Sequence, residues 1–405
     1  MTTTASGERG WHVVLAPDKF KGSLSAAEVA EHLAVGIKLT APDTRTTEVP
    51  IADGGDGTAR AALAAGYEPI TTTVTGPLGG PVTATFAIGD GHGIGAPGTL
   101  TAIVELATAS GLDQLPRTTS GRRQRDALRA TSRGTGELVL AALDSGARVV
   151  VLGVGGSACT DGGAGMVAAL GATLLGPARQ PLPDGGAALN DLASVDLSTL
   201  DPRVASTRFV LASDVDNPLL GARGAASVFG PQKGASAGDV AVLESGLRRW
   251  VAALGAEDPT TVGLEERAGA GAAGGVGYAA LAVLHAEVSP GIDLVLDLVG
   301  LDDVLATADL VITGEGSLDD QSLGGKAPVG VARLAEKHGV GTVAVCGRNT
   351  LTWAQSASAG FQAVYALTDE ETDLARCIAE PGPLLQRVGA RIGRNLAARQ
   401  PRPAE

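Results

Sequence analysis

The sequence is poor in several residue types that mark particular classes of protein. Among its 405 residues there are 3 cysteines, 2 methionines and 3 tryptophans, and aromatic residues make up 3%. The cysteines, Cys159, Cys346 and Cys377, form no CxxC pair, so we expect a reducing compartment and no disulfide framework. No apolar run reaches the roughly 18 residues of a membrane span, and residues 1–11 lack the apolar stretch of a signal peptide. We therefore predict a cytoplasmic protein.

Positive charge is also scarce. The chain has 31 Lys and Arg against 44 Asp and Glu, which gives a formal net charge of -13 at pH 7. This balance disfavours nucleic acids and anionic membrane surfaces as partners, because both repel an acidic protein. A local positive site can still bind a small anion. The expected partners are therefore small-molecule substrates, and the sequence also allows a homodimer.

Several well-known catalytic signatures are missing. The chain contains no GxxxxGKS/T phosphate loop, no HExxH metal motif and no GxSxG nucleophile elbow. The segment "GAGAAG" at 269–274 fits GxGxxG, but "GLEERA" precedes it where the dinucleotide fingerprint needs an apolar strand. A nicotinamide-dependent dehydrogenase therefore has weak support. It stays open at this point, as does a ligand-binding protein without catalytic activity.

What the sequence does contain is a regular alternation of strand-like and helix-like segments. "WHVVLAP" predicts a first strand, and "SAAEVAEHLAVGI" predicts a helix with Val29, Leu33 and Ile37 on one face. Ser25 and Glu28 fit a capping box at its start. Further strands are expected at "ARVVVLGV", "TRFVLAS", "ADLVITG", "GTVAVCG" and "AVYALT". Apolar strands separated by helices predict an α/β fold with parallel sheets.

The middle of the chain interrupts this alternation. From about residue 75 to 133 the pattern is rich in hairpins and in Gly and Pro turns, as in "TVTGPLGGPVTATFAIGD". The alternation returns toward the C-terminus. We therefore expect an outer α/β domain formed by residues 1–75 and 286–405, with a mixed α/β domain inserted at residues 76–285.

Glycine-rich clusters recur where strands should end. Six of them stand out: "PDKFKGSLS", "ADGGDGT", "GVGGSACTDGGAGM", "ASDVDNPLLGARGAASVFGPQKGA", "GAGAAGGVG" and "TGEGSLDDQSLGGKAP". Ligands of open α/β sheets bind beyond the carboxyl ends of the strands, and glycine lets the backbone approach them closely. Any one cluster is explained equally well by a tight turn. Their number, and the Asp and Lys residues among them, favour a phosphate-bearing ligand.

Charged residues concentrate in these same loops. Only 6 residues are lysines, and four of them, Lys19, Lys21, Lys233 and Lys326, lie in or beside the clusters. A compact ammonium group suits a phosphoryl group. The acidic residues in the loops are Asp18, Asp53, Asp56, Asp161, Asp214, Asp216, Asp319, Asp320 and Glu315. Carboxylates can hold Mg²⁺ or accept a proton, although a single loop aspartate more often forms a turn or a helix cap.

Taken together and in order, these motifs resemble the type I glycerate kinase family. The segments run from about Val13 to Gly347: "APDKFKGSLSAAEVA", "PIADGGDGT", "TSRGTGEL", "GVGGSACTDGGAGM", "VDNPLLGARGAASVFGPQKGA", "GAAGGVGYA" and "TGEGSLDDQSLGGKAP". The resemblance implies an enzyme that uses ATP and Mg²⁺ to phosphorylate D-glycerate, with the 2- or the 3-phosphate as product. It also implies a Rossmann-like parallel-sheet domain interrupted by a second mixed α/β domain, with the active-site cleft between them.

The resemblance also suggests roles for individual residues. The catalytic candidates are Lys21, Asp53, Asp161, Asp214 and Asp319, with either Asp161 or Asp214 as the base. The candidates for binding ATP are Gly155, Gly156, Ser157, Gly274, Gly275, Gly314, Glu315 and Lys326, and those for Mg²⁺ are Asp53, Asp56 and Asp319. Two positions depart from the family pattern, which often has Ser at the position of Lys19 and Arg at that of Ser317.

Overall fold

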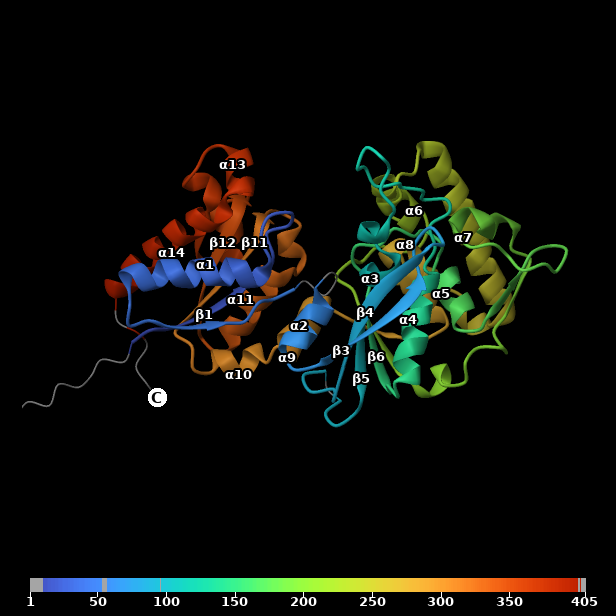
Figure 1. Ribbon diagram of the computed structural model, residues 1–405, viewed down its shortest axis with the longest axis horizontal. Helices are drawn as coiled ribbons and strands as arrows, with labels where there is room; N and C mark the ends of the chain where they lie inside the picture. Colours follow the sequence, from blue (N-terminus) through green and yellow to red (C-terminus); the bar gives the residue numbers. More distant parts are fainter. Residues whose placement is uncertain (1–9, 53–56, 95, 400, 402–405) are drawn as a thin grey trace, which may run out of the picture. The chain divides into compact units, whose positions relative to one another are not determined.

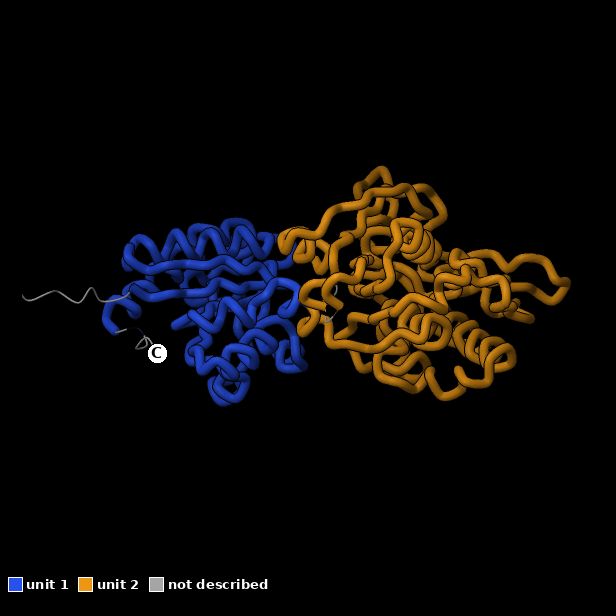
Figure 2. The backbone as a smooth tube through the Cα atoms, turned by 90° about the horizontal axis from the view of Figure 1, so that it is seen from below, with its two compact units in different colours: residues 1–53, 295–405 blue, residues 54–294 orange. Residues whose placement is uncertain are grey.

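The chain forms two compact units, each with its own sheet and core. The computed structural model describes residues 10–52, 57–94, 96–399 and 401. Unit 1 comprises residues 1–53 and 295–405, and unit 2 comprises residues 54–294; Figure 2 colours them separately. Both units mix helices with parallel strands, which confirms the predicted α/β class. The domain limits at residues 75/76 and 285/286, and the cleft between the domains, stay predictions.

Unit 1 is built on a five-stranded parallel sheet in the order β13-β12-β11-β1-β2 (Figure 1). Its strands are β1 (His12–Pro17), β2 (Arg45–Glu48), β11 (Leu310–Leu318), β12 (Gly341–Asn349) and β13 (Phe361–Ala366). β1 is buried along its whole length, as expected for a central parallel strand covered on both faces. The chain proceeds outward from β1 to β2 and, later, outward from β11 to β13. The strand order therefore reverses between β1 and β11.

Helices cover both faces of this sheet. α1 (Ala26–Thr40) packs against α14 (Pro381–Ala397), and their apolar residues share one core with Leu15 of β1 and Ile312 of β11. α11 (Ala327–Lys337) contributes Ala332 to a second core that includes Ala344 of β12. The remaining helices are α9 (Gly291–Leu298), which spans the limit between the units, α10 (Leu301–Leu305), α12 (Trp353–Ser358) and α13 (Leu374–Ala379). The capping box predicted at the start of α1 is present, since Glu28 N donates to Ser25 Oγ and Ser25 N donates to Glu28 Oε2.

Unit 2 contains a mixed six-stranded sheet in the order β10-β9-β6-β5-β4-β3. Its strands are β3 (Glu68–Thr75), β4 (Pro81–Gly89), β5 (Thr101–Glu105), β6 (Val149–Gly153), β9 (Arg208–Ala212) and β10 (Glu287–Ser289). β3 and β4 form the predicted antiparallel hairpin, and β5, β6, β9 and β10 run parallel. A separate two-stranded sheet joins β7 (Thr173–Leu175) and β8 (Ser194–Asp196).

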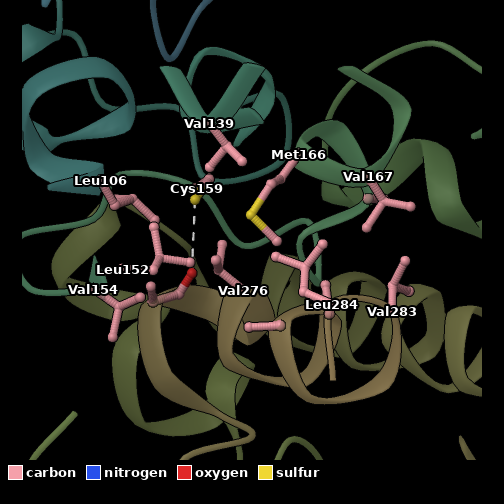
Figure 3. Close-up of a cluster of buried hydrophobic side chains, with 14 of the residues drawn as sticks. Leu106, Val139, Leu152, Val154, Cys159, Met166, Val167, Val276, Val283 and Leu284 are labelled. Carbon is pink, nitrogen blue, oxygen red and sulfur yellow. Dashed lines mark hydrogen bonds between the residues drawn. The ribbon is translucent and has the colours of Figure 1, made fainter. Parts of the chain in front are cut away.

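The core of unit 2 is made almost entirely of small and aliphatic side chains. The helices are α2 (Thr58–Ala64), α3 (Leu106–Ser110), α4 (Arg133–Asp144), α5 (Ala164–Ala169), α6 (Ala225–Phe229), α7 (Ala237–Glu257) and α8 (Ala272–Ala282). Figure 3 shows Leu152 and Val154 from β6 and the following loop, Val139 from α4 and Val276 from α8 in one cluster. In the part of the chain that the structure describes, no helix is both long and apolar enough to cross a bilayer.

Candidate functional site

In unit 1, the predicted residues lie in or after the two strands between which the strand order reverses. Pro17, the last residue of β1, pairs with Gly314 of β11, and Asp18 N donates to Gly314 O at 2.8 Å. The carboxyl edge of a parallel sheet, at such a reversal, is the usual position of a ligand crevice. The segment after β1 carries Lys21. β11 and the loop to α11 carry the other candidates, Gly314, Glu315, Asp319 and Lys326.

The side chains of these candidates differ in their exposure and in the hydrogen bonds that they already make. Lys21 is exposed and Lys326 is half-buried. Asp319 is half-buried and opens a turn, because its Oδ1 accepts from Gln321 N at 3.0 Å and its own N donates to Ser322 Oγ at 3.1 Å. The two ammonium groups are thus available to an anion, whereas Asp319 already serves the local backbone.

Close packing between neighbouring strands explains why residue 314 is a glycine. A Cβ at this position would lie 1.8 Å from Val345 O on the neighbouring strand β12, so no other residue fits without moving the backbone. A ligand is therefore not needed to explain this glycine.

In unit 2, a second group of candidates lies after the carboxyl ends of β6 and β9. Gly155, Gly156 and Ser157 follow β6, with Gly156 exposed and Ser157 buried. Asp214 follows β9; its side chain is exposed, and its Oδ1 accepts from Gly291 N at 2.8 Å, which links the ends of β9 and β10. Parallel strands end at the same edge, so the structure brings these four residues to one side of the sheet.

Asp161, by contrast, is enclosed by protein donors. It is 1% exposed, and its Oδ2 accepts from Ser132 N at 2.8 Å and from Ser132 Oγ at 2.9 Å. The same oxygen also accepts from Gly165 N at 3.3 Å and from Thr131 Oγ1 at 3.4 Å, and Gly163 N donates to Oδ1 at 3.2 Å. Burial raises the pKa of Asp161, and the hydrogen bonds from Ser132 and the glycine amides act in the opposite direction. This geometry suits a carboxylate that joins two loops better than one that receives a substrate proton.

Lys233 is a second buried charge near Asp161. It is 1% exposed, and its ammonium donates to Cys159 O. Burial lowers the pKa of Lys233, while Cys159 and Asp161 favour its charged form. The lysine thus ties the loop after α6 to the loop after β6, and it is too enclosed to meet a phosphate directly.

Cys159 is unsuited to nucleophilic attack. Its thiol donates to Ala273 O at 3.6 Å among apolar side chains (Figure 3). Burial is the main cause that raises the pKa of Cys159 to about 12. The thiolate, which is the reactive form, is therefore scarce at neutral pH.

Gly274 and Gly275 pack against the same loop. Both have positive φ, +69° and +96°, which glycine adopts without strain. Gly274 O accepts from Gly162 N at 3.0 Å, and a Cβ on Gly274 would lie 2.2 Å from Cys159 O. These glycines are explained by the close approach of two backbone segments within unit 2.

The described residues hold no ready-made metal cage. Asp53 and Asp56, two of the three predicted metal ligands, lie outside the described residues. Within the ranges 10–52, 57–94, 96–399 and 401, no three His, Cys, Asp or Glu side chains are grouped so as to hold a metal. Mg²⁺ usually binds through one or two carboxylates together with waters and substrate phosphates.

One cavity of about 540 Å³ lies elsewhere, at the opposite edge of the unit 1 sheet. Its lining includes Trp11, Leu310 and Gly341, which lie at the amino ends of β1, β11 and β12. None of the predicted site residues contributes to it.

Two residues with clear structural roles were not among those predicted from the sequence. Glu105, the last residue of β5, is 5% exposed and accepts from Gly57 N and Ala59 N. Ser132 supplies two of the donors to Asp161. An acidic residue directly after the apolar run "TAIV" was a usable signal for Glu105; nothing local distinguishes Ser132 from an ordinary helix cap.

Comparisons with known proteins agree on one family. A family model described as the glycerate kinase family matches residues 13–397. A glycerate kinase of Bacillus subtilis (strain 168) is 44% identical over 83% of this chain and 84% of its own length. A glycerate 2-kinase of Escherichia coli (strain K12) is 43% identical over 88% and 90%, respectively. A crystal structure from Salmonella typhimurium LT2, of a protein proposed to be a glycerate kinase 2, has a TM-score of 0.78 and 38% identity, covering 96% of this chain and 99% of that one.

Proposed function

Because the chain belongs to the glycerate kinase family and is a kinase, we propose that it transfers the γ-phosphoryl group of ATP to D-glycerate with the help of Mg²⁺. The observation that carries the proposal is the reversal of strand order between β1 and β11, where Lys21 and Lys326 lie in the adjoining loops. Membership of this family argues against both alternatives, a dehydrogenase and a ligand-binding protein without catalytic activity.

The proposed reaction is a single displacement at phosphorus. A glycerate hydroxyl oxygen bonds to the γ-phosphorus, the bond to the β,γ-bridging oxygen breaks, and the products are a phosphoglycerate and ADP. The hydroxyl proton passes to a carboxylate. Such a transfer depends mainly on positioning and on stabilisation of phosphoryl charge, with little covalent work by the protein.

The two ammonium groups of unit 1 suit the phosphate charge. We assign Lys21 and Lys326 to the ATP phosphates, since one is exposed and the other only half-buried. Gly314 and Glu315 would line the same edge of the sheet. Mg²⁺, when bound, would neutralise phosphate charge; Asp319 is the described carboxylate proposed to hold it, with Asp53 and Asp56 as further candidates.

In unit 2, Asp214 is a better candidate for the base than Asp161. It is exposed at the carboxyl end of β9, whereas Asp161 is 1% exposed and surrounded by donors. We propose that Gly155, Gly156 and Ser157 approach a substrate at the same edge. Asp161, Gly274 and Gly275 would contribute by shaping those loops.

We further propose the 2-phosphate as product, on the similarity to the E. coli glycerate 2-kinase. Phosphorus NMR of the product made from ATP and D-glycerate tests this, because the 2- and 3-phosphates give distinct proton couplings. No glycerate-dependent formation of ADP would refute the function itself, and the 3-phosphate would refute only the assigned position. Action in the cytoplasm and a homodimeric state stay predictions.

The assignment of Lys21 has its own test. Lys21→Met should lower kcat/KM for ATP by about a hundredfold, which corresponds to about 3 kcal/mol of transition-state stabilisation. Lys38→Met is the matched control, because Lys38 is an exposed lysine in the last turn of α1. Equal kinetics in the two variants would remove Lys21 from the mechanism.

A further inference from the structure

The start of helix α2 is held by a residue far away in the sequence. Glu105 Oε1 accepts from Gly57 N at 2.7 Å and from Ala59 N at 2.8 Å. Glu105 ends β5 and is 5% exposed, so the contact is shielded from water. Because α2 also packs on β4 and β5, the carboxylate joins the first turn of the helix to the sheet beneath it.

This contact replaces the cap that a helix usually carries within its own sequence. The first amides of a helix have no partner inside it, and a Ser, Thr, Asp or Asn at the N-cap normally accepts from one of them. Here the N-cap is Gly57, with φ +110° and no side chain to accept. A carboxylate is a favourable substitute, because the helix dipole places positive charge at this end. The position of α2 therefore depends on β5 rather than on a local turn.

The location of Glu105 connects this cap to the candidate site. Glu105 pairs with Gly153, the last residue of β6, so Glu105 lies at the edge of the sheet that also carries Gly155, Gly156 and Ser157. On the helix side, Gly57 directly follows Asp56 in the segment "ADGGDGT". One side chain thus joins the residue that follows the acidic segment to the end of β5, beside the end of β6.

We propose that Glu105 is a positioning residue for phosphoryl transfer. It fixes where the chain enters α2 immediately after the acidic segment, and so relates that entry point to the carboxyl edge of the unit 2 sheet. The inference rests on the proposed function only in naming the reaction that the positioning serves. Glu105 acts through the amides of Gly57 and Ala59 and has no assigned contact with substrate.

The test compares Glu105→Ala and Glu105→Gln with Asp239→Asn. Asp239 is the matched control, because its carboxylate accepts from Ser236 N at the start of α7 in the same unit, and α7 carries none of the candidate residues. Each variant is assayed for kcat, for KM of ATP and of glycerate, and for its urea unfolding midpoint. Hydrogen exchange at Gly57 and Ala59 reports the contact independently of activity.

A positioning role predicts a loss in kcat rather than in KM. Glu105→Ala should reduce kcat by about a hundredfold with both KM values within about threefold. Glu105→Gln keeps an oxygen that can accept from both amides but lacks the charge that favours this end of the helix, so it should lose about tenfold or less. Exchange at the two amides should be faster in Glu105→Ala. Asp239→Asn should lose stability while keeping the wild-type kcat.

Two results would overturn the proposal. One is a folded Glu105→Ala with unchanged kcat; if Glu105→Ala fails to fold, a Glu105→Gln with faster exchange at Gly57 and Ala59 but unchanged kcat decides the matter. The other is unchanged exchange at Gly57 and Ala59 in a folded Glu105→Ala. A wild-type protein without glycerate-dependent ATP turnover would refute the proposed function instead, and the exchange measurement would still judge the contact.

Discussion

At the scale of single residues, unit 2 concentrates its buried charge around one loop. Asp161 and Lys233 are both 1% exposed. Asp161 lies in the loop after β6 and accepts from five donors, and Lys233 donates to Cys159 O of the same loop. Burying charge is costly unless hydrogen bonds satisfy it. The arrangement therefore holds the glycine loops in one conformation.

Asp161→Asn tests this interpretation. The amide nitrogen of Asn would replace one oxygen and face donors such as Ser132 N or Gly163 N, leaving at least one buried donor without an acceptor. We expect the free energy of unfolding to fall by about 1–3 kcal/mol, measured by urea denaturation. An unchanged urea midpoint would show that the hydrogen bonds to Asp161 contribute nothing to stability.

At the scale of elements, close backbone packing explains glycines that no ligand requires. Gly36 in α1 lies against α14, and a Cβ there would be 2.2 Å from Gln386 O. Gly389 in α14 faces α1 in the same way, with a Cβ position 2.5 Å from Leu33 O. The two helices can therefore approach each other closely, which joins the two chain segments that make up unit 1.

Gly36→Ala should destabilise the protein despite the better helix propensity of alanine. The propensity gain is about 1 kcal/mol, whereas forcing apart a packed interface typically costs about 1–3 kcal/mol, and here the clash is with backbone. Gly238→Ala in α7 is the control, because its Cβ would meet only Ser236 Oγ at 3.7 Å. We expect a lower melting temperature for the first variant and an unchanged or higher one for the second. The opposite order would contradict the packing argument.

At the scale of the whole molecule, unit 2 is one continuous stretch of chain with a core of its own. The apolar residues of that core run from Val74 to Ala286, so they all lie within residues 54–294. Unit 1, in contrast, needs both ends of the chain, because β1 from the N-terminal segment pairs with β11 from the C-terminal one. This asymmetry predicts that only unit 2 can fold from an uninterrupted segment.

Residues 54–294 produced alone should therefore unfold cooperatively. A domain of this size buries enough apolar surface to be stable by itself. A urea titration followed by circular dichroism and by the fluorescence of Trp250, which is fully buried, should show a single transition that coincides for the two signals. A gradual, non-cooperative change would mean that unit 2 depends on the rest of the chain.

The sequence alone determined the α/β class, the capping box of α1, the β3–β4 hairpin and the family motifs. Each of these depends on residues near one another in the chain, such as Ser25 with Glu28, or on an order of segments that can be read directly. Local spacing also placed lysines and aspartates in loops after strands, which the structure confirms for Lys21 and Asp214.

Only the tertiary structure separated exposed site candidates from buried ones. Asp161 and Asp214 look alike in the sequence, since both follow a strand in a loop, yet one is enclosed by Ser132 and the other faces solvent. The cap that Glu105 provides for α2 joins residues 46 and 48 positions apart, so no local pattern could reveal it. Burial and hydrogen bonding depend on which distant segments folding brings together. For that reason only the structure shows which candidates are exposed and which residue caps α2.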